Sequence, residues 1–351
     1  MKAALFHAII HQMSPSLDQN PSGLEPGPGV EIPQKPSLIR QAAPYLLAGG
    51  ILVYMFRQVN LPEVMWVLTN PDNHPLVIIE AYLFYCAVYY FTDVLSFSRV
   101  YSWFNTPMSF VETLKLRFAS YTVQAVNGVL TEIMCVLYMF RVKKVSIMNS
   151  TSSMAFVYFN ETVSLILLLS FCAFFLPEQR QIQIEVSGFP FWTLFQALVV
   201  LALVLALLWV AFFQSGLSGR FPKLHNRAVL LSFRRASLGN YLEIFSYRFG
   251  NNLVSLFVNV MILYALGIEA PLWLMFAASP IMVSAAYWPV SAGGFGGPQL
   301  AAHFLLKGYA TVPEVLAYSL VWSSLFFLTR TLTGLPFLLP VYKAAFPPPK
   351  K

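Results

Sequence analysis

Long apolar runs separated by short polar stretches dominate the chain from residue 42 onward. A helix that crosses a membrane needs about 20 predominantly apolar residues, because each residue advances about 1.5 Å through a hydrocarbon core of about 30 Å. This pattern predicts an all-α, polytopic helical membrane protein. The runs expected to span or enter the membrane are 42–56, 76–97, 111–140, 154–176, 191–213, 253–266, 272–289 and 315–342.

The ends of the chain differ from this middle part. Residues 1–40 begin with a short apolar patch and continue into a proline-rich segment, which predicts a mobile N-terminal tail. The patch, Ala3 to Ile10, is too short to span a membrane. We expect one transmembrane domain over residues 41–345 and a short cytoplasmic tail over 346–351.

Composition supports an integral membrane protein. Hydrophobic residues make up 57% of the chain and charged residues 11%, against about 25% in soluble proteins. The mean hydropathy is +0.63. The net charge of +7 lies in short loops between apolar runs, a distribution typical of cytoplasmic loops beside anionic lipid rather than of a nucleic-acid-binding surface. The cysteines and histidines show no metal-ligand spacing and no phosphate-binding loop is visible, so we expect no cofactor.

The position of basic residues predicts a re-entrant hairpin in the first half. If residues 111–140 crossed the membrane once, then Arg141, Lys143 and Lys144 would lie outside, against the positive-inside rule. The rule holds if this segment enters and leaves from the cytoplasm and turns near Asn127 and Gly128.

The second half predicts a matching hairpin of opposite orientation. The basic segment 214–250 is assigned to the cytoplasm, with 230–249 either topogenic or lying along the inner leaflet. If 272–307 dips in from outside, the final run ends inside with the C-terminus. Two halves, about 76–176 and 253–342 joined by 177–252, would then form an inverted-topology repeat. A short sequence echo between 116–120 and 274–279 agrees with this interpretation.

The segment from Trp288 to Gln299 contains four glycines and two prolines and cannot continue a helix. It is either a surface loop or a break at membrane depth, where protein or a water-filled cavity must satisfy the backbone. The charge-based topology favours the buried break, at the tip of the second hairpin.

These motifs resemble the transmembrane region of lysylphosphatidylglycerol synthases, which also occurs in flippase-like membrane proteins. That family has a Gly-Gly-apolar-Gly pattern between two apolar segments and an arginine in a later apolar helix, matched here by 293–296 and Arg330. Ala292 stands where the family usually has proline, and Gln299 where it usually has glutamate. In its first half the family often has a Gly-Glu pair and, later, a Glu-Arg pair. Here Glu132 and Glu161 match only the acid of each pair. The resemblance covers about residues 42–345 and implies the lipid-translocating part of such proteins without the soluble synthase domain.

We therefore expect a lipid flippase or translocator that moves a lipid with an anionic or lipid-linked polar headgroup between leaflets, in the bacterial cytoplasmic membrane. Intramembrane charges are costly and commonly functional. The expected substrate-binding residues are Arg330, Arg117, Lys115, Glu132, Glu161, Asp93, Gly293, Gly294, Gly296 and Gln299. Internal ion pairing is the alternative for the charged residues, and close helix packing for the glycines.

Two other functions remain open at this stage. One is a non-catalytic partner or regulator of lipid or cell-envelope assembly, with an envelope-assembly enzyme or a second copy of the chain as its partner. The other is an intramembrane enzyme on a lipid-linked substrate, with Glu132 or Glu161 as general base. No nucleophile or metal motif in the sequence supports the enzyme.

Overall fold

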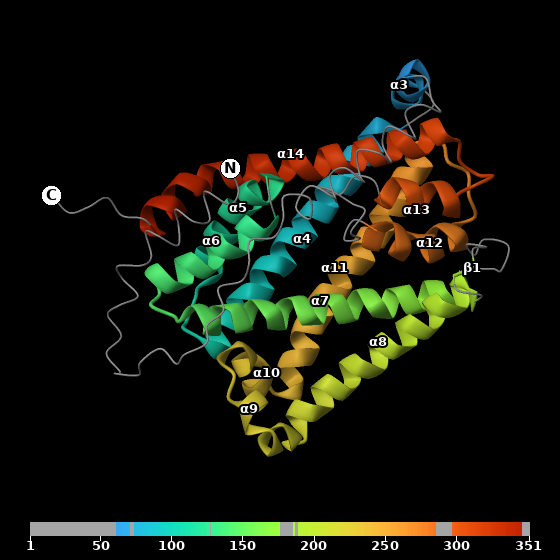
Figure 1. Ribbon diagram of the computed structural model, residues 1–351. Coiled ribbons are helices and arrows are strands. Elements are labelled where there is room, and N and C mark those ends of the chain that lie inside the picture. The colour runs from blue at the N-terminus through green and yellow to red at the C-terminus, as the bar shows by residue number, and fades with distance from the viewer. Residues whose placement is uncertain are drawn as a thin grey trace, which may run out of the picture. The chain divides into compact units, whose positions relative to one another are not determined.

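Helices form most of the described chain because its apolar runs contain few glycines or prolines in their interiors. The computed structural model describes residues 61–70, 74–126, 128–175, 185–186, 189–285 and 297–345. All of them belong to the unit that begins at Ala42. The longer helices, labelled in Figure 1, are α3 (Leu61–Thr69), α4 (Pro75–Phe104), α5 (Phe110–Val126), α6 (Gly128–Arg141), α7 (Ile147–Phe175), α8 (Phe191–Gln214), α11 (Leu238–Ala265), α12 (Leu272–Ser284), α13 (Gly297–Leu305) and α14 (Val312–Ala345).

Short elements join α8 to α11 and α7 to α8. The helical turns between α8 and α11 are η2 (Leu217–Arg220), α9 (Pro222–His225), η3 (Ala228–Leu230) and α10 (Leu231–Arg235). Between α7 and α8, strands β1 (Glu185–Val186) and β2 (Phe189–Pro190) pair antiparallel.

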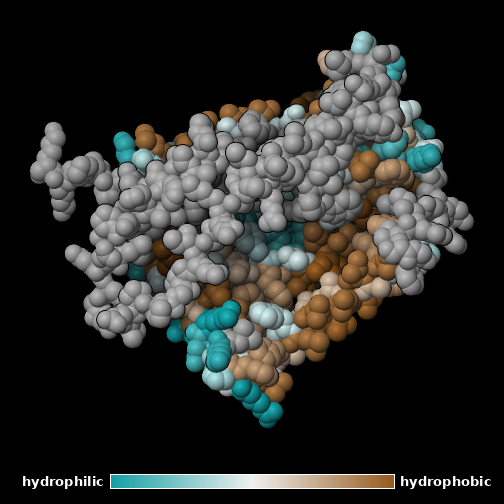
Figure 2. Space-filling model, in the orientation of Figure 1, coloured by the Kyte–Doolittle hydropathy of each residue, from teal (hydrophilic) through white to brown (hydrophobic). Residues whose placement is uncertain are grey.

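The protein is an all-α, polytopic integral membrane protein. Among the described residues, α4, α7, α8 and α14 are long and apolar enough to cross a membrane. Helix α8 is the most hydrophobic of the four, and its leucines at 198, 201, 205, 207 and 208 are exposed, as expected of a face that contacts lipid. Figure 2 shows α8 as a continuous hydrophobic band.

The segment predicted as the first re-entrant hairpin forms two helices, α5 and α6. Helix α5 ends at Val126 and α6 begins at Gly128, so the break falls where the sequence predicts a turn. The start of α5 is held beside the residues that follow α6, since Lys143 pairs with Glu112 at 2.8 Å. At 17 and 14 residues, or about 26 and 21 Å, each helix is too short to cross a hydrocarbon core alone.

A second helix pair, α12 and α13, lies at the other end of the long helices (Figure 1). Its outer ends join α11 and α14, and the start of α4 is fixed there by a hydrogen bond from the His74 N–H to the Ala265 carbonyl, 3.1 Å. Pro271 precedes α12, and Thr311 forms side-chain and backbone hydrogen bonds with Glu314 at the start of α14. Residues 286–296, which hold most of the predicted glycine break, lie outside the described residues.

Two apolar cores occupy the opposite ends of the long helices. The α12–α13 core takes the first part of α4 and the last part of α11. The α5–α6 core takes the last part of α4 and the first part of α11. Helices α7 and α14 likewise contribute to one core near each end. The middle parts of the long helices therefore lie at one level between the two cores. Buried residues at this level need not be apolar.

The structure differs from the sequence prediction in the segment before α11. Residues 238–249, predicted as part of a basic cytoplasmic segment, begin α11 itself, which Ser237 caps through a reciprocal pair of hydrogen bonds with Asn240. Because of this cap the helix begins at Leu238, well before the predicted start at Leu253. This places Arg248 inside the helix bundle, where its side chain is 1% exposed.

Candidate functional site: a buried charge cluster

Charged residues occupy the level between the two apolar cores. Six of them, from six helices, form what we call the charge cluster: Asp93 on α4, Arg117 on α5, Glu132 on α6, Glu161 on α7, Arg248 on α11 and Arg330 on α14. The cluster contains three arginines and three carboxylates, so its formal charges balance. Taking such groups out of water costs several kcal/mol per ion, and good hydrogen bonds are needed to offset that cost.

Asp93 is the centre of the cluster. Its side chain is 1% exposed and accepts a bidentate interaction from Arg117, with Nε at 2.7 Å from Oδ2 and Nη2 at 3.4 Å from Oδ1. The Tyr121 hydroxyl also donates to Oδ2. The Arg117 guanidinium lies over the Phe97 ring, 4.0 Å from its centroid. Asp93 therefore fixes the first hairpin to α4 through two residues of α5.

Arg248 reaches the same carboxylate from α11. Its Nη1 lies 2.9 Å from Asp93 Oδ1 and 3.5 Å from Glu161 Oε2. The Glu161 side chain is 25% exposed, so the cluster opens toward the surface at this point. One turn further along α7, Ser164 accepts a hydrogen bond from Asn252 Nδ2 at 2.7 Å, which continues the polar contact between α7 and α11.

Arg330 joins the cluster through aromatic rings. Its guanidinium carbon lies 3.7 Å from the centroid of Phe326, 4.9 Å from that of Tyr89 and 5.4 Å from that of Tyr121. Residue 330 is 6% exposed. Since Tyr121 also donates to Asp93, the rings connect α14 to the centre of the cluster.

Glu132 occupies the edge of the cluster on α6. The Tyr158 hydroxyl of α7 donates to its Oε1. Its buried Oε2 has no hydrogen-bond partner in the part of the chain that the structure describes. Glu132 follows Thr131, whose hydroxyl donates to the Ser120 carbonyl at 3.2 Å and ties α6 to α5 near the tip of the hairpin.

Five of the predicted site residues therefore meet in one place: Asp93, Arg117, Glu132, Glu161 and Arg330. Others do not. Lys115 is exposed, because two residues along a helix turn its side chain about 200° away from Arg117. Gln299 is 1% exposed on α13, beside the α12–α13 core. Gly293, Gly294 and Gly296 lie outside the described residues.

Arg248 and Asn251 are two buried polar residues of this level that were not predicted from the sequence as site residues. A helical pattern could have found them, since Tyr241, Ile244, Arg248, Asn251 and Ser255 recur at three- and four-residue spacing and all are buried. Counting Arg248 among the basic residues of a cytoplasmic loop concealed that periodicity.

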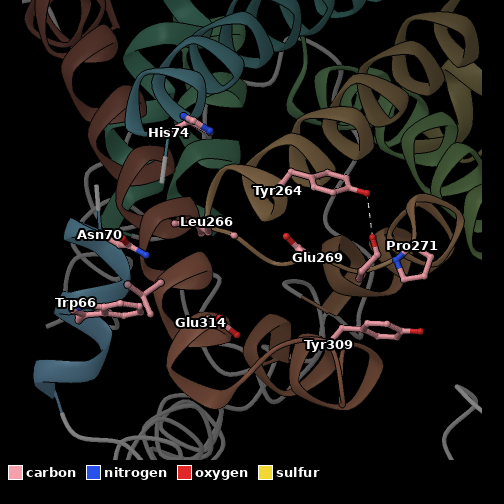
Figure 3. Close-up of a pocket in the computed structure, with 12 residues that line it drawn as sticks. Trp66, Asn70, His74, Tyr264, Leu266, Glu269, Pro271, Tyr309 and Glu314 are labelled. Atoms are coloured by element: carbon pink, nitrogen blue, oxygen red, sulfur yellow. Dashed lines mark hydrogen bonds between the residues drawn. The ribbon is translucent and has the colours of Figure 1, made fainter. Parts of the chain in front are cut away.

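A separate pocket of about 720 Å³ lies at the end of the bundle beyond the α12–α13 core. Figure 3 shows the Glu269 and Glu314 carboxylates facing into the space between Trp66 and Tyr309. The Tyr264 hydroxyl is turned away and donates to the Ala270 carbonyl at 3.1 Å. Glu314 already accepts from the Thr311 N–H at 2.7 Å, and Glu269 is exposed. We call this the end pocket.

In the charge cluster, the arginines could exchange a carboxylate partner for another anionic group. In the end pocket, Glu269 is exposed and Glu314 is bound to Thr311 of its own helix start. An anionic group that approached the arginines would compete with Asp93 and Glu161, and the freed carboxylates would meet a cationic group. Figure 2 shows polar residues near the place where α4, α7 and α11 come together in Figure 1. These three helices carry Asp93, Glu161 and Arg248.

Comparison with known proteins identifies a family. The model of the family described as the lysylphosphatidylglycerol synthase TM region matches residues 41–334, which include all six residues of the charge cluster. No curated protein and no solved structure matches the chain.

Proposed function

The chain belongs to the family of lysylphosphatidylglycerol synthase transmembrane regions, and from that premise we propose that it translocates a lipid with a polar headgroup between the leaflets of a membrane. The family suggests a function related to membrane lipids. The observation that carries the proposal is the charge cluster, buried between two apolar cores, with Asp93, Glu161 and Arg330 on helices long and apolar enough to span the membrane. A headgroup crossing a membrane needs polar partners at the depth where hydrocarbon offers none.

The position of the cluster along the helices supports this function. Asp93 lies near the middle of α4, which runs from Pro75 to Phe104, and Glu161 lies at the middle of α7, which runs from Ile147 to Phe175. Arg330 is likewise near the middle of α14. Helices of this length extend about 45–50 Å, so their middle residues lie near the membrane midplane if they cross it.

We further propose that the two helix pairs are re-entrant hairpins of an inverted repeat. Helices α4 to α7 and α11 to α14 each follow the order long helix, short pair, long helix. The sequence echo between 116–120 and 274–279 falls on the first helix of each pair. Broken helices that meet at depth commonly build the substrate site of transporters with such repeats.

In this proposal both termini and the basic residues Arg141, Lys143 and Lys144 lie in the cytoplasm of a bacterium, with the protein in its inner membrane. The orientation is tested with Lys143→Cys and a thiol reagent that does not cross membranes. We expect labelling in inverted vesicles and none in intact cells. Labelling from outside the cell would contradict the re-entrant first hairpin.

The mechanism follows from exchange within the charge cluster. An anionic headgroup competes with the partly exposed Glu161 for the arginines while Asp93 stays paired, and the apolar tails remain in lipid beside the exposed faces of the helices. Without substrate, Asp93 and Glu161 neutralise Arg117 and Arg248 and keep the unloaded site closed to ions. The lipid with an anionic or lipid-linked headgroup is the only partner this mechanism requires.

Reconstitution into liposomes with a fluorescent anionic lipid tests the function. We expect Arg330→Ala to reduce the rate of lipid transfer at least tenfold while the protein stays folded, because Arg330 lies buried within the cluster. Lys115→Ala, on the exposed face of α5, is the matched control and should transfer lipid at the wild-type rate. A wild-type protein that moves none of the lipids tested would contradict the proposal.

A further inference from the structure

Two arginines contact Asp93 in different ways. Arg117 uses the edge formed by Nε and Nη2, and both nitrogens face the Asp93 carboxylate. Arg248 uses only Nη1, which it shares between Asp93 and Glu161. The corresponding edge of Arg248, formed by its Nε and Nη2, has no contact with Asp93 or Glu161 in the described part of the chain and is free to bind another group.

Arg248 Nε and Nη2 are both buried and have no hydrogen-bond partner within the described ranges. The residue is 1% exposed, so bulk water does not satisfy these donors. A buried guanidinium donor without a partner costs more than a neutral one, because charged groups lose the most hydration on burial. Nε and Nη2 point in parallel from one side of a planar group and match two oxygens of a phosphate or carboxylate.

A second unsatisfied group lies one helical turn further along α11. The Oδ1 atom of Asn251 is buried and has no partner among the described residues, and the residue is 4% exposed. An amide oxygen accepts hydrogen bonds, so it suits the hydroxyl or amine that commonly accompanies a phosphate in a headgroup. Residues i and i+3 share one face of a helix, so both groups serve the same side of α11.

We propose that the Nε and Nη2 edge of Arg248 is the oxyanion-binding element of the charge cluster, and that it binds the phosphate of a headgroup bidentately. This inference rests on the proposed function for the identity of the ligand as a lipid headgroup. The oxyanion-binding chemistry follows from the buried donors of Arg248 alone. Nη1 would keep its contact with Asp93, so binding does not require the central ion pair to break. Glu161, whose side chain is 25% exposed, lies 3.5 Å from Nη1 of the same guanidinium, so the cluster opens toward the surface beside Arg248.

The assignment gives the two arginines different roles, whereas the sequence led us to expect substrate binding by Arg117 and a place in a basic cytoplasmic segment for Arg248. Arg117 would hold the first hairpin to α4, and its edge is already occupied by Asp93. Arg248 would contact the substrate. Lysine at either position keeps the positive charge and loses the two-donor edge. Arg117→Lys should therefore weaken the contact between α5 and α4, and Arg248→Lys should weaken binding of the substrate.

The test measures phosphate binding to the full chain purified in detergent, by calorimetry, with a short-chain phosphatidylglycerol and with inorganic phosphate as probes. We expect Arg248→Lys to weaken binding of short-chain phosphatidylglycerol at least tenfold, since a lost charge-assisted hydrogen bond costs about this much. Arg99→Lys is the matched control, because Arg99 is 54% exposed and pairs with Glu243 at the surface. A thermal unfolding midpoint close to that of the wild type shows that the variant is folded.

The two probes separate the sources of the oxyanion. Binding of the lipid probe, lost in Arg248→Lys, supports a headgroup phosphate, and binding of inorganic phosphate alone with the same loss supports an oxyanion site for a soluble ligand. If neither probe binds the wild-type protein, or if Arg248→Lys binds both equally well, the proposal is wrong. Lipid transfer, measured after the same proteins are reconstituted into liposomes, distinguishes this failure from that of the proposed function. If Arg248→Lys weakens binding but the wild-type protein transfers no lipid, the proposed translocation is wrong and the oxyanion site at Arg248 stands.

Discussion

The charge cluster and the end pocket are both polar regions in an apolar protein, and they differ in how their charges are held. In the cluster, Asp93 has a 1% exposed side chain and contacts two arginines and a tyrosine from other helices. In the end pocket, Glu269 is exposed and Glu314 caps its own helix. The end pocket has a volume of about 720 Å³, yet of the two regions only the cluster has ions whose burial needs a compensating cause. Burial and pairing, rather than volume, therefore identify the site.

The largest effect is expected from removing the centre of the cluster. Asp93→Asn would leave Arg117 and Arg248 buried without their shared countercharge, which costs about 3–5 kcal/mol for a broken buried pair. We expect a markedly lower thermal unfolding midpoint of the detergent-purified protein and no lipid transfer. Glu243→Gln, which removes a partner of the exposed Arg99, is the control, with less than about 1 kcal/mol expected. Equal stability of the two variants would remove the distinction between cluster and surface.

A second, intermediate effect is expected where α14 crosses α5 beside the cluster. A Cβ atom on Gly334 would lie 2.1 Å from Thr122 Oγ1 and 2.2 Å from the Phe118 carbonyl oxygen, so the two helices cannot stay as close with any larger residue. We expect Gly334→Ala to cost about 1–3 kcal/mol through overpacking and to slow lipid transfer. Gly250→Ala on α11 is the matched control, because its Cβ would meet no atom within 4 Å. Thermal unfolding and transfer of both variants decide the point, and a Gly334→Ala protein as stable as Gly250→Ala would contradict the close crossing.

The smallest effect is expected in the end pocket. Glu269→Gln changes an exposed carboxylate, so its effect on stability should lie within about 0.5 kcal/mol. Lipid transfer should also stay near the wild-type rate, because the pocket lies beyond the α12–α13 core from the cluster. A tenfold loss of transfer in Glu269→Gln would show that the end pocket belongs to the transport path.

The sequence predicted the helical membrane fold and several boundaries well. Hydrophobic runs gave α7, α8 and α14 to within a few residues at most ends, and the positive-inside rule placed a break at Asn127 and Gly128, where α5 ends and α6 begins. Both signals are local, so one sequence suffices to read them. The three cysteines, which show no metal-ligand spacing in the sequence, are buried free thiols.

The site was harder to predict because it depends on which faces of different helices meet. Lys115 and Arg117 lie two residues apart, and only the observed packing shows that Arg117 faces α4 while Lys115 is exposed. Arg248 was not predicted as a site residue for another reason. Its charge was counted with those of a basic cytoplasmic segment, whereas the cap at Ser237 begins the helix that carries it. The predictions for Gly293, Gly294 and Gly296 stay predictions.

The central claim is that the headgroup passes through the charge cluster and not through the end pocket. Photocrosslinking from a single reactive residue tests it most directly, with the residue at position 252, where Asn252 donates to Ser164 one turn beyond Glu161, or at position 309, where Tyr309 lines the end pocket. The account predicts that an anionic lipid in proteoliposomes crosslinks at position 252 and that Asp93→Asn abolishes this product. Crosslinking at position 309 with none at 252 would contradict it.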